Sequence, residues 1–176
     1  MGSTHASILL HFIFAPKGRE NLLRDDFREE LHKYIAGIVA NFEHSPKLLA
    51  IGSVTDHVHL FVSLHPMIAP AKFIQAIKAN SSRFINERGV FHGRFEWQEG
   101  YGVFSHSKSQ KMEVIRYVLN QQEHHRVKTF EEEYIELLKA LEIEFKADYL
   151  FEFYRRMGNE HAVPPGLETQ SSTSTR

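Results

Sequence analysis

The order of the apolar segments is the feature that most constrains the fold of this chain. Four short runs rich in apolar and aromatic residues have the length of β-strands, at residues 7–14, 48–54, 58–64 and 95–106. Residues 25–42 and 70–89 are longer, and their apolar residues recur at the spacing of an amphipathic helix. The order strand, helix, strand, strand, helix, strand predicts an α+β fold of the ferredoxin-like type, in which an antiparallel sheet carries helices on one face.

Further helices are predicted after the fourth strand. Ser107 and Gln110 have the spacing of a capping box, which opens a helix that continues to about His125. Thr129 and Glu132 form a second box before the last predicted helix. Because the first two helices cover one face of the sheet, the other face is expected to stay open, either as a platform for single-stranded nucleic acid or as a dimer surface.

The length of 176 residues favours a single domain. We expect this domain to span residues 1–157 and to be followed by a polar, disordered C-terminal tail over residues 158–176. The absence of cysteine excludes a disulfide framework and any metal site built on thiolates. No apolar run approaches the ~20 residues of a membrane helix and no signal peptide is recognisable, so a cytoplasmic protein without membrane contact is expected.

The formal net charge of −1 conceals an uneven distribution of charged residues. Residues 1–128 hold sixteen lysine and arginine residues against twelve aspartate and glutamate residues, a net charge of +4. The remaining residues hold five basic against ten acidic residues, a net charge of −5. The larger part of the chain can therefore face an anion such as the phosphate backbone of a nucleic acid.

Two histidines flank a valine where the third strand is predicted to begin. Side chains alternate between the faces of a strand, so His57 and His59 lie on one face while Val58 points into the core. Neutral imidazoles are good ligands for a divalent transition ion, and this pair supplies two of the positions that such an ion needs. The same residues also fit a polar strand face without a metal. Asp56 either orients one of the histidines or serves only the preceding turn.

A tyrosine and a glutamine are four residues apart on the helix predicted after the fourth strand. Tyr117 and Gln121 therefore share one helix face, with His124 and His125 one turn further along. The apolar residues of this helix occupy its other side. Taken alone, Tyr117 fits either a catalytic group or an amphipathic ring that lies against the protein surface.

Together, the two motifs resemble those of the HUH single-tyrosine transposases, the small insertion-sequence and REP-associated enzymes. The histidine triplet is a weak signal by itself, whereas its combination with Tyr117 and Gln121 on a later helix is specific. The resemblance covers about residues 7–151. It also includes three further runs, Gly100-Tyr101-Gly102-Val103-Phe104-Ser105, Asn120-Gln121 to His124-His125, and Thr129-Phe130-Glu131-Glu132-Glu133-Tyr134.

The resemblance implies a DNA transposase that cleaves and rejoins single-stranded DNA. In that family a divalent ion, Mg²⁺ or Mn²⁺, is held by the two histidines and a third ligand from the tyrosine helix, and the tyrosine attacks a phosphodiester. The corresponding metal ligands here are His57, His59 and Gln121, and the corresponding nucleophile is Tyr117. The expected products are a 5′-phosphotyrosine link and a free 3′-hydroxyl, which can reverse the attack at another DNA end.

The residue types suit this reaction. A phenol has a pKa near ~10 and is mostly protonated at neutral pH, so attack on an anionic phosphodiester requires charge neutralisation and orientation. A divalent ion supplies both. The amide oxygen of Gln121 is neutral and leaves the positive charge of the ion available to the phosphate. His124 and His125 lie within one turn of Gln121, and either is an alternative third ligand.

The resemblance also implies a homodimer and a DNA substrate that contains imperfect hairpins. In the family, the tyrosine helix of one subunit can complete the site of the other. Gly100 and Gly102 belong either to a flexible link before that helix or to a simple turn. The basic residues that are candidates for contacts to DNA phosphate are Lys17, Arg19, Lys78, Arg83, Arg94, Lys108 and Arg116.

Three alternative functions stay open on the sequence alone. The first is a domesticated REP-associated nuclease or strand transferase, which acts on chromosomal repeat hairpins without moving its own gene. The second is a non-catalytic module that binds single-stranded nucleic acid on the sheet face and needs neither a metal nor Tyr117. The third is a histidine metal site that serves only the stability of the fold.

Overall fold

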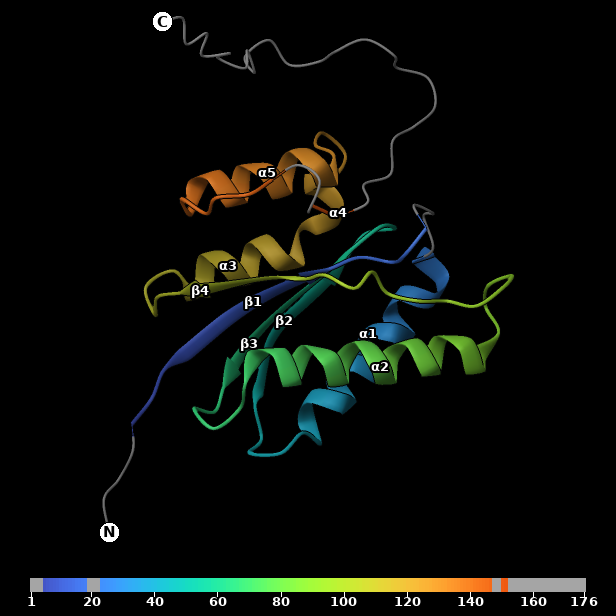
Figure 1. The fold of residues 1–176 in the computed structure, drawn as a ribbon, viewed down its shortest axis with the longest axis horizontal. Helices are drawn as coiled ribbons and strands as arrows, with labels where there is room; N and C mark the ends of the chain where they lie inside the picture. The colour runs from blue at the N-terminus through green and yellow to red at the C-terminus, as the bar shows by residue number, and fades with distance from the viewer. Residues whose placement is uncertain (1–4, 19–22, 147–149, 152–176) are drawn as a thin grey trace, which may run out of the picture.

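The computed structural model describes residues 5–18, 23–146 and 150–151 (Figure 1). Within these residues lies an antiparallel sheet of four strands, β1 (Ile8–Phe14), β2 (Lys47–Ser53), β3 (Val58–Leu64) and β4 (Gly102–His106). The strands lie in the order β2-β3-β1-β4. This arrangement confirms the α+β, ferredoxin-like fold class. The expected boundary after residue 157, and the tail beyond it, lie outside the described residues.

Helices lie on both faces of the sheet (Figure 1). The helices on one face are α1 (Asp25–Ala40) and α2 (Pro70–Arg88), and those on the other are α3 (Lys111–Leu119), α4 (Gln121–His124) and α5 (Phe130–Ala140). Side chains alternate along β1, so Phe12 packs towards α1 and α2 whereas Ile13 packs towards α5. Within the described part of the chain, no helix has both the length and the apolar character needed to cross a membrane.

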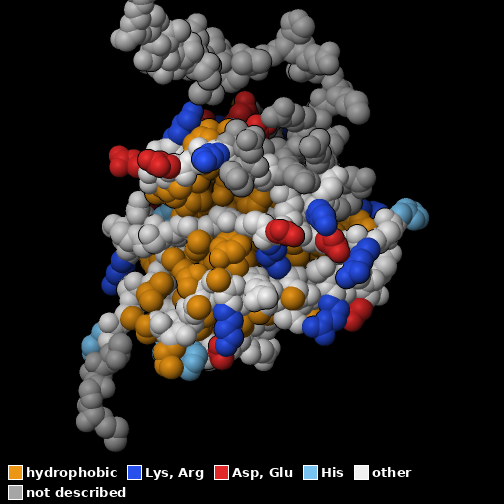
Figure 2. Space-filling view, in the orientation of Figure 1, with side chains coloured by type: hydrophobic (Ala, Val, Ile, Leu, Met, Phe, Trp, Pro, Cys, Tyr) orange, Lys and Arg blue, Asp and Glu red, His pale blue; other side chains and the backbone are white. Residues whose placement is uncertain are grey.

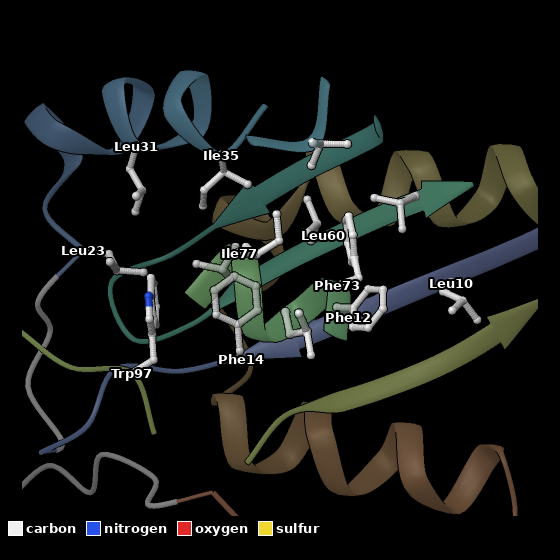
Figure 3. Close-up of a cluster of buried hydrophobic side chains, with 14 of the residues drawn as sticks. Leu10, Phe12, Phe14, Leu23, Leu31, Ile35, Leu60, Phe73, Ile77 and Trp97 are labelled. Carbon is white, nitrogen blue, oxygen red and sulfur yellow. The ribbon is translucent and has the colours of Figure 1, made fainter. Parts of the chain in front are cut away.

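The larger hydrophobic core fills the space between the sheet, α1 and α2 (Figure 3). Phe12 and Leu60 from the strands meet Leu31 and Ile35 of α1 and Phe73 of α2, and all five side chains are fully buried. Burial of a side chain of this size contributes about 1.5–3 kcal/mol. This layer therefore fixes the sheet from one side and leaves the opposite face to the polar residues singled out in the sequence.

The opposite face is not open, and the expectation that it would be is wrong. Phe61 of β3 packs against Val114 and Val118 of α3. Phe104 of β4 packs near Tyr134 of α5, with ring centroids 6.2 Å apart. The strands carry apolar residues on both faces, so α3 and α5 remove from water a surface that would otherwise be exposed.

The fourth strand is shorter than predicted. Before Gly102, Trp97 takes part only in an isolated bridge. Lys78 of α2 donates hydrogen bonds to the main-chain carbonyls of residues 98–100. An ammonium group, rather than a neighbouring strand, satisfies these carbonyls, and the segment is consequently a loop. Gly102 is the first residue of β4. A glycine suits this position because a Cβ there would lie 2.9 Å from Oη of Tyr134.

The hydrogen bonds of both predicted capping boxes form, but the first box lies in the turn before α3, which begins at Lys111 with Gln110 as its N-cap. The N–H of Ser107 donates to Oε1 of Gln110 at 3.0 Å, and the N–H of Gln110 lies 3.4 Å from Oγ of Ser107. The side chains of Thr129 and Glu132 form the second box at the start of α5. The chain between β4 and α3 is thus held by hydrogen bonds of its own.

The helix expected to continue to about residue 125 is divided into α3 and α4. α3 ends at Leu119, and Asn120 has φ −95° and ψ 18°, outside the helical range. The side chain of Gln121 still reaches back one turn, because its Nε2 donates to the carbonyl oxygen of Tyr117 at 3.3 Å. The predicted neighbour relation of Tyr117 and Gln121 is therefore kept across the break.

Candidate active site

The histidine pair lies on the sheet face that α3 to α5 cover. His57 immediately precedes β3 and His59 is its second residue, so the alternation of strand side chains turns both rings to this face. The ring centroids are 4.7 Å apart. Both rings are fully buried. The sequence predicted a shared face correctly, but it predicted an exposed pair, which is wrong because of the covering helices.

Tyr117 reaches the histidine pair from α3. Its ring centroid is 5.7 Å from that of His59, in an edge-on arrangement. The carbonyl of Val118 approaches β2 at Gly52, where a Cβ would lie 1.9 Å from the carbonyl oxygen. The absence of a side chain at Gly52 therefore brings the helix close to the sheet. Tyrosine and histidines belong to one chain, so this arrangement needs no second subunit.

Glu133 of α5 joins the groups at the centre of the site. Its side chain is 4% exposed, and its Oε1 accepts a hydrogen bond from the hydroxyl of Tyr117. The same oxygen lies 3.2 Å from Nε2 of Gln121, which donates to it. The other oxygen, Oε2, lies 3.5 Å from Nε2 of His57 and 3.7 Å from Nε2 of His59. One carboxylate thus contacts the nucleophile candidate and the predicted metal ligands.

Sequence reasoning missed the role of Glu133, although one signal for it was present. Three consecutive glutamates open α5, and the sequence interpretation above uses them only in a capping box and in the family resemblance. Glu133 is three residues after Phe130 and five before Leu138, both buried, so it lies on the inner face of the helix. A carboxylate at an apolar helical position is rarely buried without a partner. This position was the available signal.

Second partners hold the ring nitrogens of the histidines that point away from the centre. Nδ1 of His57 lies 2.7 Å from Oδ1 of Asp56, which confirms the orienting contact considered for this aspartate. Nδ1 of His59 lies 2.8 Å from Nε2 of His11. His11 is buried in β1, and the sequence indicates no role for it beyond its place in an apolar strand. Such contacts fix the tautomer and the orientation of a metal-binding imidazole.

Burial and charge shift the pKa values of the central groups in different directions. Burial, together with the Glu133 carboxylate, raises the pKa of Tyr117 well above its ordinary value, so the phenol stays protonated. Burial also lowers the pKa of His59 to about 4, which keeps this imidazole neutral. Burial opposes the charged form of Glu133, but the hydrogen bond with His125 and the nearby imidazoles of His57 and His59 outweigh it and hold the pKa of Glu133 low. An ionised carboxylate thus faces neutral His59.

The unpaired polar atoms of the site fit a divalent ion. Among the described residues, five buried side-chain nitrogen or oxygen atoms lack a hydrogen-bond partner. Three of them are Nε2 of His57, Nε2 of His59 and Oε1 of Gln121, which belong to the three residues that the sequence predicts as metal ligands. Burying a polar atom without a partner is costly. A bound cation would satisfy these atoms, so the donor set is compatible with the predicted ligands.

The predicted DNA-contacting residues occupy different surroundings. Arg83, Lys108 and Arg116 are exposed. Arg94 is exposed beside Glu96, and Lys17 forms an ion pair with this glutamate at 3.0 Å. Figure 2 shows Lys and Arg side chains interspersed with acidic ones on the face in view.

Two further residues of this set differ from the exposed ones. The ammonium group of Lys78 donates its hydrogen bonds to the carbonyls of the 98–100 loop. Arg19 lies outside the described residues.

Acidification is expected to destabilise the fold through His32, a half-buried residue of α1. Burial, with a smaller contribution from the charge of Arg28, lowers the pKa of His32 from 6.5 to about 4. Between these pH values the unfolded chain binds a proton that the folded chain does not, so the free energy of unfolding falls as the pH falls, by on the order of 2 kcal/mol. Urea denaturation at pH 4–7 measures this slope.

The variant His32→Gln is the control for this pH dependence. Glutamine does not titrate and can still hydrogen-bond to Oγ of Ser53, which lies 2.8 Å from Nε2 of His32. The variant should therefore show a flatter dependence of stability on pH than the wild-type protein. Equal slopes for the two proteins would show that His32 is not responsible.

Comparison with known proteins places this fold and site in a family. The family model described as "Transposase IS200 like" matches residues 4–121. A Deinococcus radiodurans R1 protein assigned as a transposase has 24% sequence identity and a TM-score of 0.53, over 69% of this chain and 95% of that chain. A REP-associated tyrosine transposase bound to a REP hairpin has 12% identity and a TM-score of 0.52, over 71% of this chain and 74% of that chain. No curated protein matches the sequence.

The fold and the family match together are those of a single-tyrosine DNA transposase. The chain belongs to the IS200-like transposase family, because the family model matches more than half of its length. The two solved structures support the fold alone at their levels of identity. Membership confirms the resemblance stated from the sequence and makes the chain a DNA-cleaving enzyme of the transposase class. The match ends at Gln121, so His125 and Glu133 lie beyond it.

Proposed function

We propose that this chain is a metal-dependent transposase that cleaves and rejoins single-stranded DNA containing hairpins, through a 5′-phosphotyrosine intermediate on Tyr117. The observation that carries the proposal is the convergence of Tyr117, the two histidines and Gln121 within one chain. The REP-associated relative described above is bound to a REP hairpin, which supports a hairpin as the substrate.

His57, His59 and Gln121 would hold the ion, Mg²⁺ or Mn²⁺, through Nε2, Nε2 and Oε1. When bound, the ion supplies positive charge to a non-bridging phosphate oxygen and contributes several kcal/mol to the transition state. Asp56 and His11 keep the two imidazoles in place from the far side of the rings.

Tyr117 supplies the nucleophile. Its oxygen attacks the phosphorus, the bond from phosphorus to the 3′-oxygen breaks, and the 5′-phosphate stays on the tyrosine. Oε1 of Glu133 already accepts the phenolic hydrogen and is the atom in place to take the proton. The leaving 3′-oxygen takes a proton from water and ends as a hydroxyl. Return of this hydroxyl, or of another DNA end, reverses the same steps.

A homodimer and surface contacts to DNA complete the proposal. β2 and β4 form the two edges of the sheet. Because the site assembles within one chain, we propose that each subunit uses its own tyrosine. Exposed basic residues on α2, in the loop before β4, in the turn after β4 and on α3 would contact phosphate, namely Arg83, Arg94, Lys108 and Arg116. The earlier predictions Lys17, Arg19 and Lys78 stay proposals with them.

The proposal is tested with a hairpin oligonucleotide, Mn²⁺ and the full-length protein, analysed on a denaturing gel. A 3′-end label should migrate with the protein, because the downstream strand carries the 5′-phosphate. A 5′-end label should instead appear in a shorter free strand. Chelation of the ion should prevent both products. A covalent adduct that carries only the 5′-end label, or binding without any cleavage, would contradict the proposed chemistry.

A further inference from the structure

We propose that His125 and Glu133, which lie beyond the segment matched by the family model, bind the same ion as His57 and His59. The inference rests on the proposed function, because it concerns the same metal site. It enlarges the ligand set with one residue that follows α4 and one from α5. The carboxylate would then link the ion to the nucleophile, since its other oxygen accepts the hydroxyl of Tyr117.

The four side chains are close enough to share one ion. One potential ligand atom from each of His57, His59, His125 and Glu133 lies within 4.8 Å of all the others. Oε2 of Glu133 is the atom that all three imidazoles approach, and its shortest distance is 2.7 Å, to Nε2 of His125. Its distances to Nε2 of His57 and His59 are 3.5 Å and 3.7 Å. Small movements would bring all four atoms to an ion.

Hydrogen bonds on the far side of the rings fix which nitrogen is available. Nδ1 of His57 faces a carboxylate oxygen of Asp56, and Nδ1 of His125 lies 2.9 Å from the carbonyl oxygen of Lys128. Both oxygens are acceptors only, so both Nδ1 atoms carry the hydrogen. In the neutral ring, Nε2 then presents a lone pair. This pattern, with Nδ1–H on a carboxylate or carbonyl, is typical of metal-binding histidines.

His59 is compatible with the same tautomer. Its Nδ1 shares a hydrogen bond with Nε2 of His11, and donation by His59 leaves its Nε2 unprotonated. Lone pairs of imidazole nitrogens then point at the Oε2 atom of an ionised carboxylate. Lone pairs that face each other at these distances repel unless a proton or a metal cation lies between them.

The two oxygens of Glu133 differ in their hydrogen-bond partners. Oε1 accepts from the hydroxyl of Tyr117 and from Nε2 of Gln121, which are conventional donors. Oε2 faces only imidazole nitrogens among the described residues. The carboxylate therefore uses one oxygen for the nucleophile and leaves the other for a cation. A ligand set of imidazoles and a carboxylate suits Mn²⁺ better than Mg²⁺, which prefers oxygen ligands and keeps its waters.

The test is a calorimetric titration of metal-free, full-length protein with Mn²⁺, in the absence of DNA. Glu133→Gln and His125→Gln are each expected to weaken Mn²⁺ binding by on the order of 10–100-fold, as His57→Gln should. Glutamine keeps nearly the shape of glutamate but removes the charge. Glu123→Gln is the matched control, because this exposed carboxylate follows Gln121 closely and pairs only with Arg126 among the described residues.

The outcomes separate this inference from the proposed function. If His57→Gln weakens Mn²⁺ binding while Glu133→Gln and His125→Gln bind it like the wild-type protein, the inference is overturned and the proposed function stands. If His57→Gln also binds Mn²⁺ normally, the metal site of the proposed function is overturned as well. His125 is less central than Glu133, so His125→Gln provides the same test should Glu133→Gln fail to fold.

Discussion

Replacement of Tyr117 by phenylalanine is expected to abolish the covalent protein–DNA band and to slow strand cleavage by at least about 10⁴-fold. The phenolic oxygen is the only atom removed, and it is the atom that the proposal makes the nucleophile. No other tyrosine lies at the histidine pair among the described ring contacts. The substitution therefore removes the chemistry while leaving the ion ligands in place.

The same variant should fold normally. Tyr117→Phe removes one hydrogen bond to Oε1 of Glu133, but this oxygen still accepts from Gln121. The free energy of unfolding is therefore expected to change by only about 1 kcal/mol. Denaturation curves and Mn²⁺ titration verify that the loss of cleavage is not a loss of fold or of ion.

Tyr34→Phe is the matched control for this substitution. Tyr34 lies on α1, on the opposite side of the sheet, where its ring stacks on Phe84 with centroids 3.9 Å apart. The same atom is removed from a surface remote from the site, so cleavage and adduct formation should match the wild-type protein. An adduct that persists in Tyr117→Phe would assign the nucleophile elsewhere, and a non-catalytic DNA-binding module would then explain the site better.

The order of strands and helices could be predicted because it depends on local patterns. Strand-length apolar runs, helical spacing and two capping boxes are properties of neighbouring residues, and the order of elements that they predicted forms as expected. The shared face of His57 and His59 follows from strand alternation alone. The relation of Tyr117 to Gln121 follows from one turn of helix. These local rules correctly predicted which of these side chains lie next to each other.

Contacts between distant segments account for what the sequence left undetermined. The burial of the histidine pair depends on α3 and α5 crossing the second face, which no local pattern specifies. The contact of His11 with His59 depends on the pairing of β1 with β3. Glu133 joins the site only because α5 packs there. In each case segments that are separate in the sequence must pack together, and only the assembled sheet and helices bring the side chains into contact.

The break at Asn120 shows a third kind of limit. The residues before and after it favour helix, so periodicity predicted one continuous helix through residue 125. In the structure, α4 begins at Gln121 and the chain then turns, which places His125 with its Nε2 against Glu133. The tertiary contacts of His125 and Glu133 accompany this local departure from helical geometry.

Gly52→Ala is expected to impair both stability and catalysis, because the added methyl group disrupts the contact between β2 and α3 that positions Tyr117. An added Cβ would lie 1.9 Å from the carbonyl oxygen of Val118, and the obstacle is main chain rather than a flexible side chain. α3 must therefore move away from β2. Such overpacking costs about 1–3 kcal/mol or more, and a shift of about 1 Å at Tyr117 can slow the reaction by about 10²-fold.

Gly37→Ala is the control that isolates this contact. Gly37 lies within α1, and a Cβ there would meet nothing within 4 Å. Alanine is the better helix former by roughly 0.5–1 kcal/mol, so this variant should be at least as stable as the wild-type protein and equally active. Urea denaturation and the rate of adduct formation on the labelled hairpin distinguish the two variants. If Gly52→Ala matched Gly37→Ala in both measurements, close approach of α3 to the sheet could not be what positions Tyr117.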